Sequence, residues 1–136
     1  MTNAEMKLKE LVMLRARPTS TLTAESESEL LELAVAQLNL PLWQAEGIIV
    51  STAESASFEV ESEIDRVALA MLAALAGSSR TISFVDFETV VIFYSEKLKS
   101  APGVARSRVK KLVDKLDLQP RRSGFFWSAR WFRTIR

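Results

Sequence analysis

The chain has 136 residues, 48% of them hydrophobic and 26% charged, which fits one soluble domain with a core of its own. It has no cysteine and no histidine, which excludes a disulfide scaffold and a thiolate metal site and removes the commonest general base. The net charge is +1. Only 4 glycines and 4 prolines are present, so helices are favoured over a fold rich in tight hairpins.

The remaining acids, serines and lysines form no catalytic motif, so we expect a binding protein that is not an enzyme and uses no cofactor, metal or small-molecule substrate. The longest apolar stretch, Val67 to Ala76, is too short to span a membrane. The expected location is the cytoplasm.

Charge is strongly segregated along the chain. The net charge is +2 over Met1 to Thr19, −10 over Ser20 to Asp65, +1 over Arg66 to Ser100 and +8 over Ala101 to Arg136. The basic end would suit nucleic acid or an anionic lipid surface. Alternatively, the acidic half would pair with the basic end, within one chain or between copies, or the charges of a nearly neutral protein are simply uneven.

The first expected helices follow from apolar spacing and capping residues. A short helix is expected over Lys7 to Arg15, followed by a loop over Thr19 to Glu25. Ser26 and Glu29 have the spacing of a capping box, which predicts a helix over Glu27 to Leu38.

A third helix is expected to start at Pro41 and to run to about Ala53, with a loop over Glu54 to Ser57. The β-branched run Ile48 to Val50 leaves a strand open as an alternative there. The alternation over Phe58 to Glu61 fits either a short strand or the start of the next helix.

A clean apolar stripe predicts a helix over Ile64 to Leu75, with Ser62 and Asp65 as a capping pair and Gly77 at its end. No internal repeat is evident.

Ser83 and Asp86 repeat the capping spacing before a helix that reaches about Ser100. Ala101 to Gly103 should break this helix, and a further helix is expected over Val109 to Leu116.

These elements predict an all-α fold, a compact bundle of about five to six short helices in a single domain over 1–136. Residues 1–25 are expected to be partly mobile. Residues 118–136 form a basic aromatic tail or wing, in which the pattern from Phe125 onward fits strand and helix equally.

Within residues 95–116, a glycine and an apolar residue precede a helix with two buried positions three residues apart. These residues are Gly103, Val104, Val109 and Leu112. The segment resembles the turn and recognition helix of helix-turn-helix DNA-binding proteins. It departs from that pattern at Lys99, where the family has a small residue, and at Pro102, where it has an apolar one.

The resemblance implies a helix that offers polar and cationic side chains to DNA bases and phosphates. The expected nucleic-acid-binding residues are Arg106, Ser107, Arg108, Lys110, Lys111 and Lys115, with Arg121 and Arg122 in a turn or wing. The alternative is an ordinary amphipathic helix with a solvated basic face.

Aromatic and arginine side chains alternate in the last residues. Those expected to stack on bases or to contact a partner are Trp127, Trp131, Arg130 and Arg133. Such a segment would stack on unpaired bases, lie in a membrane interface, dock in a partner's groove or complete the protein's own core.

Within residues 64–100, the segment Ile82 to Phe87 resembles the end of an EF-hand loop and the start of its exit helix. The early ligand positions hold Leu75, Gly77 and Ser79, and Arg80 replaces the glycine of the sharp turn. The resemblance therefore implies a metal-free helix-loop-helix unit, as in TerB-like or calmodulin-like bundles.

The leading expectation is a DNA-binding protein that uses the helix-turn-helix-like segment and the basic C-terminus. The first alternative is a protein-interaction adaptor or assembly factor with an acidic face over Ser26 to Asp65 and an aromatic tail. The second is peripheral membrane attachment through the tail.

Overall fold

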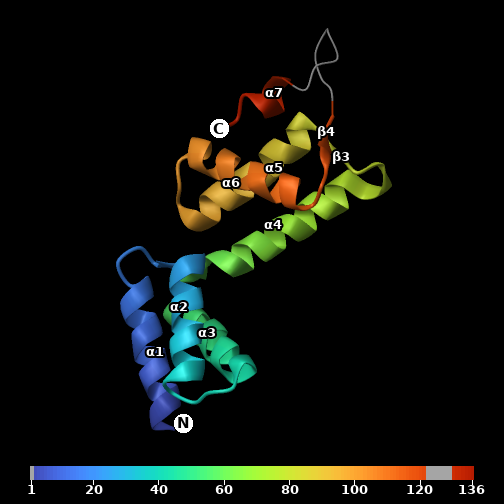
Figure 1. Cartoon of the computed structure of the whole chain (residues 1–136). Helices are drawn as coiled ribbons and strands as arrows, with labels where there is room; N and C mark the ends of the chain where they lie inside the picture. Colours follow the sequence, from blue (N-terminus) through green and yellow to red (C-terminus); the bar gives the residue numbers. More distant parts are fainter. Residues whose placement is uncertain (1, 122–129) are drawn as a thin grey trace. The chain divides into compact units, whose positions relative to one another are not determined.

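The computed structural model describes residues 2–121 and 130–136 (Figure 1). Seven α-helices and four two-residue strands make up the regular structure of these residues, so the all-α prediction is confirmed. Ile48 to Val50 lie within the expected helix, so the strand that was left open as an alternative there does not form. Arg122 and Trp127 lie outside the described residues.

The chain divides into two compact units, Met1–Glu63 and Ile64–Arg136, each with its own hydrophobic core, where we had expected one domain. The elements of unit 1 are α1 Asn3–Ala16, β1 Thr21–Leu22, α2 Ala24–Ala36, α3 Leu42–Ala56 and β2 Glu59–Val60. The remaining elements are α4 Glu61–Ala76, a 3-10 turn at Gly77–Ser79, β3 Thr81–Ile82, α5 Phe84–Leu98, α6 Pro102–Lys115, β4 Gln119–Pro120 and α7 Arg130–Arg133.

The two units repeat one element order: helix, strand, helix, helix, strand. In unit 1, β1 pairs with β2 in parallel, with Thr21 opposite Glu59. In the second unit, β3 pairs with β4 in parallel, with Thr81 opposite Gln119. Each residue of the second strand pair lies 60 positions after its counterpart in the first pair. The chain therefore contains a structural repeat with a spacing of 60 residues.

Backbone conformation repeats at the same spacing. Three pairs of non-glycine residues have positive φ: Ser20 and Arg80, Asn39 and Lys99, Ser57 and Asp117. Because left-handed backbone is uncommon outside glycine, coincidence at three pairs is strong evidence for equivalent turns.

Burial repeats too. Pairs that are buried in both units include Val12 and Leu72, Leu22 and Ile82, Leu30 and Val90, Ala34 and Tyr94, and Ile49 and Val109. Yet only four pairs of residues 60 apart are identical over the 60 positions compared: Ala16 and Ala76, Thr21 and Thr81, Leu38 and Leu98, Ala45 and Ala105. Our expectation of no internal repeat was therefore wrong, because the repeat preserves burial and backbone rather than residue identity.

The helix caps of the two units correspond. The Ser83 hydroxyl accepts a hydrogen bond from the Asp86 amide at 3.1 Å, as the capping spacing predicted. Thr23 accepts from the Ser26 amide at the same distance, so the N-cap of α2 lies three residues before the predicted one.

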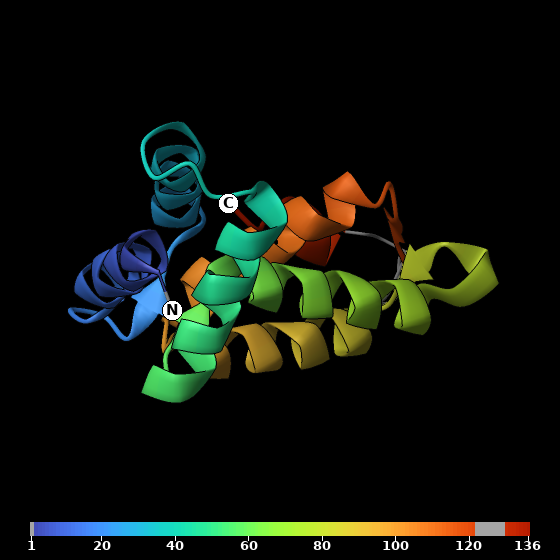
Figure 2. The same ribbon diagram turned by 90° about the horizontal axis from the view of Figure 1, so that it is seen from below.

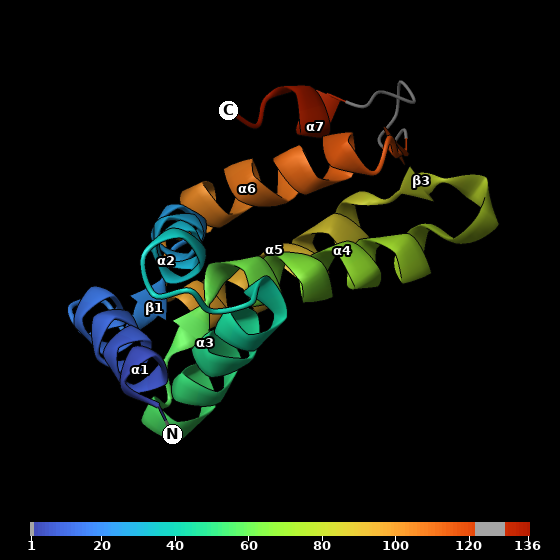
Figure 3. The same ribbon diagram turned by 60° about the horizontal axis from the view of Figure 1, so that its bottom comes forward.

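The N-terminal segment contributes a core helix. Leu8, Val12 and Ala16 of α1 are fully buried against α2 and α3. In unit 2, helices α4, α5 and α6 enclose the second core (Figures 2 and 3). Phe87 and Tyr94 are its largest fully buried side chains.

The two units carry opposite charge. Unit 1 has 11 acidic and 4 basic residues, and unit 2 has 6 acidic and 14 basic residues, which gives net charges of −7 and +8. The charge segregation along the sequence is therefore a division between two folded units.

Candidate functional site

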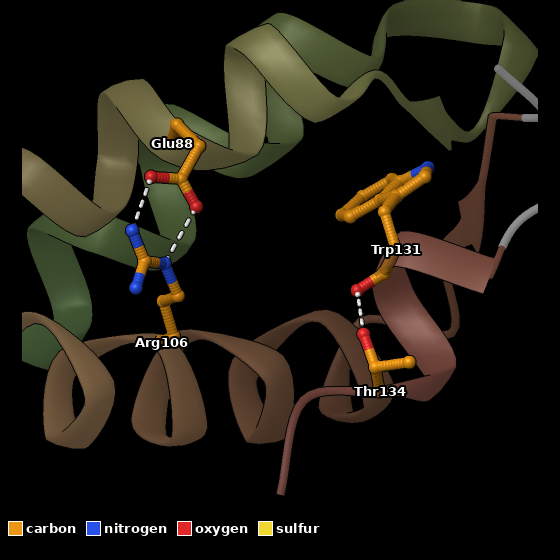
Figure 4. Close-up of polar contacts among 4 residues, drawn as sticks. All are labelled: Glu88, Arg106, Trp131 and Thr134. Carbon is orange, nitrogen blue, oxygen red and sulfur yellow. Dashed lines mark hydrogen bonds and ion pairs between the residues drawn. The ribbon is translucent and has the colours of Figure 1, made fainter. Parts of the chain in front are cut away.

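Arg106 was expected to face DNA, but it faces its own chain. Its Nε donates to Glu88 Oε1 at 2.9 Å and a terminal nitrogen donates to Glu88 Oε2 at 3.1 Å (Figure 4). This bidentate pair joins α6 to α5, and the Glu88 carboxylate raises the pKa of Arg106.

Lys110 is also engaged within unit 2. Its Nζ donates to the Ile135 carbonyl at 2.9 Å and lies 4.9 Å from the centroid of the Phe132 ring. Lys110 therefore fastens the C-terminal residues to α6.

Arg108 lies beside a buried polar contact. The Tyr94 hydroxyl donates to Asp65 Oδ1 at 2.5 Å. Burial raises the pKa of Tyr94, the bond to Asp65 raises it further, and Arg108 acts in the opposite direction through a hydrogen bond of its own. The Arg108 side chain is thus directed toward α5 and α4.

The other predicted nucleic-acid-binding positions that the structure describes lie on α6 and directly after β4. Lys111 and Lys115 are exposed on α6, and Ser107 is half-buried. Arg121 is exposed and donates to the Thr81 hydroxyl at 3.3 Å. Lys111 and Lys115 lie one helical turn apart on α6, whereas Arg106 and Lys110 are held in contacts within the unit.

The turn before α6 differs from the helix-turn-helix expectation. Gly103 lies in the first turn of α6, which begins at Pro102. The left-handed residue of the connection is Lys99, with φ of 53°. The glycine that was expected to start the turn is therefore helical.

Trp131 and Phe132 complete the core of unit 2. The Trp131 ring lies edge-on to Phe84 at 5.4 Å and tilted against Phe87 at 5.3 Å. Phe132 is 8% exposed and meets Phe87 edge-on at 6.1 Å. The Trp131 indole also donates to the Arg121 carbonyl at 3.1 Å. These two aromatic side chains pack inward, whereas Arg130 and Arg133 of α7 are exposed.

A crevice of about 410 Å³ lies beside α7. Phe84 and Trp131 form its aromatic walls, and the Glu88–Arg106 pair lies along it (Figure 4). Thr134 closes the last turn by donating to the Trp131 carbonyl at 3.1 Å. The polar groups of this crevice are largely engaged with one another.

A larger groove, of about 570 Å³, lies in unit 1 between α2, α3 and the residues around β2. Four carboxylate side chains line it: Glu27, Glu46, Glu54 and Glu63. We call it the acidic groove. Glu46 and Glu54 are exposed, and Glu27 accepts a hydrogen bond from the Ser62 hydroxyl at 2.7 Å.

An aromatic side chain and a glycine shape the acidic groove. Trp43 lines it and is 75% exposed, the highest value for a large hydrophobic side chain in the described part of the chain. Gly47 lines it one helical turn later, and a Cβ added there would have nothing within 4 Å. Sequence reasoning identified the acidic segment but missed Trp43 and Gly47, which only the fold of α3 brings to the groove.

Residues 2–121 and 130–136 contain neither a cluster of metal-ligating side chains nor a membrane-spanning helix. No group of three or more potential metal-ligating side chains comes together there. No helix in these residues is long and apolar enough to cross a membrane.

Comparisons with models of protein families, with curated proteins and with solved structures found no match to this chain.

Proposed function

We propose that this protein is an interaction module whose acidic groove binds a basic segment of a partner protein. The observation that carries this proposal is the groove itself, where four carboxylates and the 75% exposed Trp43 line one cavity of a unit with net charge −7. An exposed indole attracts guanidinium groups through its π face, and carboxylates pair with them through bidentate hydrogen bonds.

The expected affinity is modest. Each solvent-exposed ion pair contributes about 0.2–1 kcal/mol, and a cation–π contact contributes a similar amount. Four such pairs and one cation–π contact together contribute at most about 5 kcal/mol, so we expect a dissociation constant of about 0.2 mM or weaker for a short basic peptide at low salt, and weaker binding still at physiological salt.

The test is binding of labelled oligo-arginine, followed by fluorescence anisotropy at two salt concentrations. Glu46→Lys with Glu54→Lys removes groove carboxylates, and Glu25→Lys with Glu32→Lys changes the net charge equally at exposed sites outside the groove. The proposal expects the groove variant to bind at least about tenfold more weakly and the control to bind within about twofold of the wild type. An equal loss of peptide affinity in the two variants would contradict the proposal, because net charge alone would then attract the peptide.

Nucleic-acid binding by unit 2 is the second candidate. Its net charge of +8, with Lys111 and Lys115 exposed on α6, favours a polyanion. Support is weaker because Arg106 and Lys110 are held in contacts within the unit. Lys111→Glu with Lys115→Glu should abolish retention on duplex DNA, and wild-type retention by this variant would end the candidate.

Membrane attachment through the tail is the least supported function. Phe132 is buried and Trp131 is partly buried against Phe87 within unit 2, which argues against insertion of these side chains into a lipid surface.

A further inference from the structure

The structural repeat connects the acidic groove with the site where α7 packs. In unit 2, α7 packs against Phe87 of α5 and under Lys110 of α6, with the crevice residues Gly103 and Arg106 beside it. These four residues mark the seat of α7 on its own unit.

The residues of unit 1 that lie 60 positions earlier line the acidic groove. Phe87 corresponds to Glu27, Gly103 to Trp43, Arg106 to Glu46 and Lys110 to Val50. The acidic groove is therefore the counterpart, in unit 1, of the seat that holds α7 in unit 2.

Unit 1 has no counterpart of α7 among the described residues. There β2 ends at Val60 and α4 begins at Glu61, so the chain passes directly from the strand into the next helix. The repeat thus has one seat that a short helix covers and one that stands open as a groove of about 570 Å³.

The charge of the side chains at these equivalent positions differs between the two units. Arg106 and Lys110 are cationic, whereas the groove has Glu46 and Val50 at those positions, with Glu54 one turn further along α3. Trp43 supplies an aromatic surface where unit 2 has a glycine. A helix that carries arginines, as α7 does, meets more opposite charge in unit 1 than in its own unit.

We infer that the acidic groove binds a helix of a partner protein that resembles α7, with two adjacent aromatic side chains flanked by arginines or lysines. This inference rests on the proposed function and specifies its ligand. The aromatic side chains pack over Gly47 and against Trp43, and the flanking cations reach Glu46 and Glu54.

The probe is a labelled, alanine-based helical peptide of about 16 residues, a length at which an isolated helix forms, with Arg-Trp-Phe-Arg at its centre. A second peptide with Arg-Ala-Ala-Arg keeps the charge and removes the aromatic rings. The inference expects the full chain to bind the first peptide at least about tenfold more tightly, because two aromatic contacts contribute about 0.5–1.5 kcal/mol each beyond their buried area.

The groove variant should lose this preference, and Glu25→Lys with Glu32→Lys should keep it. Gly47→Leu fills open space in the groove. This substitution should lower the affinity for the aromatic peptide at least about tenfold while the fold is retained. Gly47→Ala is the control for replacing the glycine.

Equal affinity for the two peptides, with binding still lost in the groove variant, would overturn the inference and leave the proposed function standing. No binding of either peptide, or of oligo-arginine, would overturn both. Concentration-dependent self-association of the full chain that the groove variant abolishes would also overturn it, because the occupant would then be α7 of a second copy.

Discussion

At the scale of single residues, Tyr94 gives unit 2 a defined response to alkali. It is the only tyrosine of the chain, is 1% exposed and donates to Asp65. Burial and this bond raise its pKa in the folded state above the ordinary value of about 10. Protonated Tyr94 therefore contributes its full stability below about pH 10, and this contribution is lost as the pH rises toward the folded-state pKa.

The measurement is a spectroscopic titration of tyrosinate in the native protein, with the urea-unfolded chain as the reference. We expect the native midpoint to lie clearly above that of the unfolded chain. Tyr94→Phe should flatten the loss of stability above about pH 10, since the titrating group is gone. Coincident midpoints would contradict the buried hydrogen bond.

Gly47 lowers the stability of helix α3 and leaves the groove open beside it. Glycine within a helix is less stable than alanine by about 0.5–1 kcal/mol, and the added Cβ meets nothing within 4 Å. Gly47→Ala should therefore raise the free energy of unfolding of unit 1 by about that amount in urea denaturation. A loss of stability would show that the helix needs glycine for a reason other than space.

Sequence reasoning reached some residues and missed others for physical reasons. The Ser83 cap was predictable because its partner, Asp86, lies three residues away. The pairing of Arg106 with Glu88 was not, because the partner lies on another helix, 18 residues earlier. A basic face can be read from spacing, but its partners depend on how helices pack.

At the scale of elements, apolar spacing predicted where the helices lie. It predicted the residues at which the helices begin less well. Thr23 rather than Ser26 caps α2, because both residues can cap and only the fold chooses between them. The strands were largely missed because each is two residues long, too short for an alternating pattern. Of the four strands in the described residues, only β2 lies in a stretch for which a strand was an alternative.

The equivalent caps provide a paired test of the repeat. Thr23→Ala and Ser83→Ala each remove one side-chain bond to an amide that begins a helix. We expect each change to lower the free energy of unfolding by about 1 kcal/mol in urea denaturation followed by circular dichroism. An effect in only one of the two variants would contradict equivalent roles.

At the scale of the whole molecule, the repeat explains how one small chain presents two oppositely charged surfaces. Buried positions and left-handed turns keep the framework in both units, and the exposed positions have diverged in charge. This organisation was hidden in the sequence, because identity at the repeat spacing is confined to four pairs.

The two cores predict separate responses to damage in one unit. Phe132→Ala removes a buried ring from unit 2 and should lower that unit's stability by about 3 kcal/mol. Native-state hydrogen exchange should then speed up in α5 and α6, while amides of α1 and α2 keep their protection. Equal acceleration throughout the chain would show that the cores unfold as one.

The central claim is that the acidic groove, rather than the basic unit, binds the partner. Amide chemical-shift mapping with the Arg-Trp-Phe-Arg peptide tests it most directly. The account predicts shifts concentrated between Trp43 and Glu54 and around Ser62, which weaken in the groove variant. Shifts confined to α6 and α7, with the groove unperturbed, would contradict it.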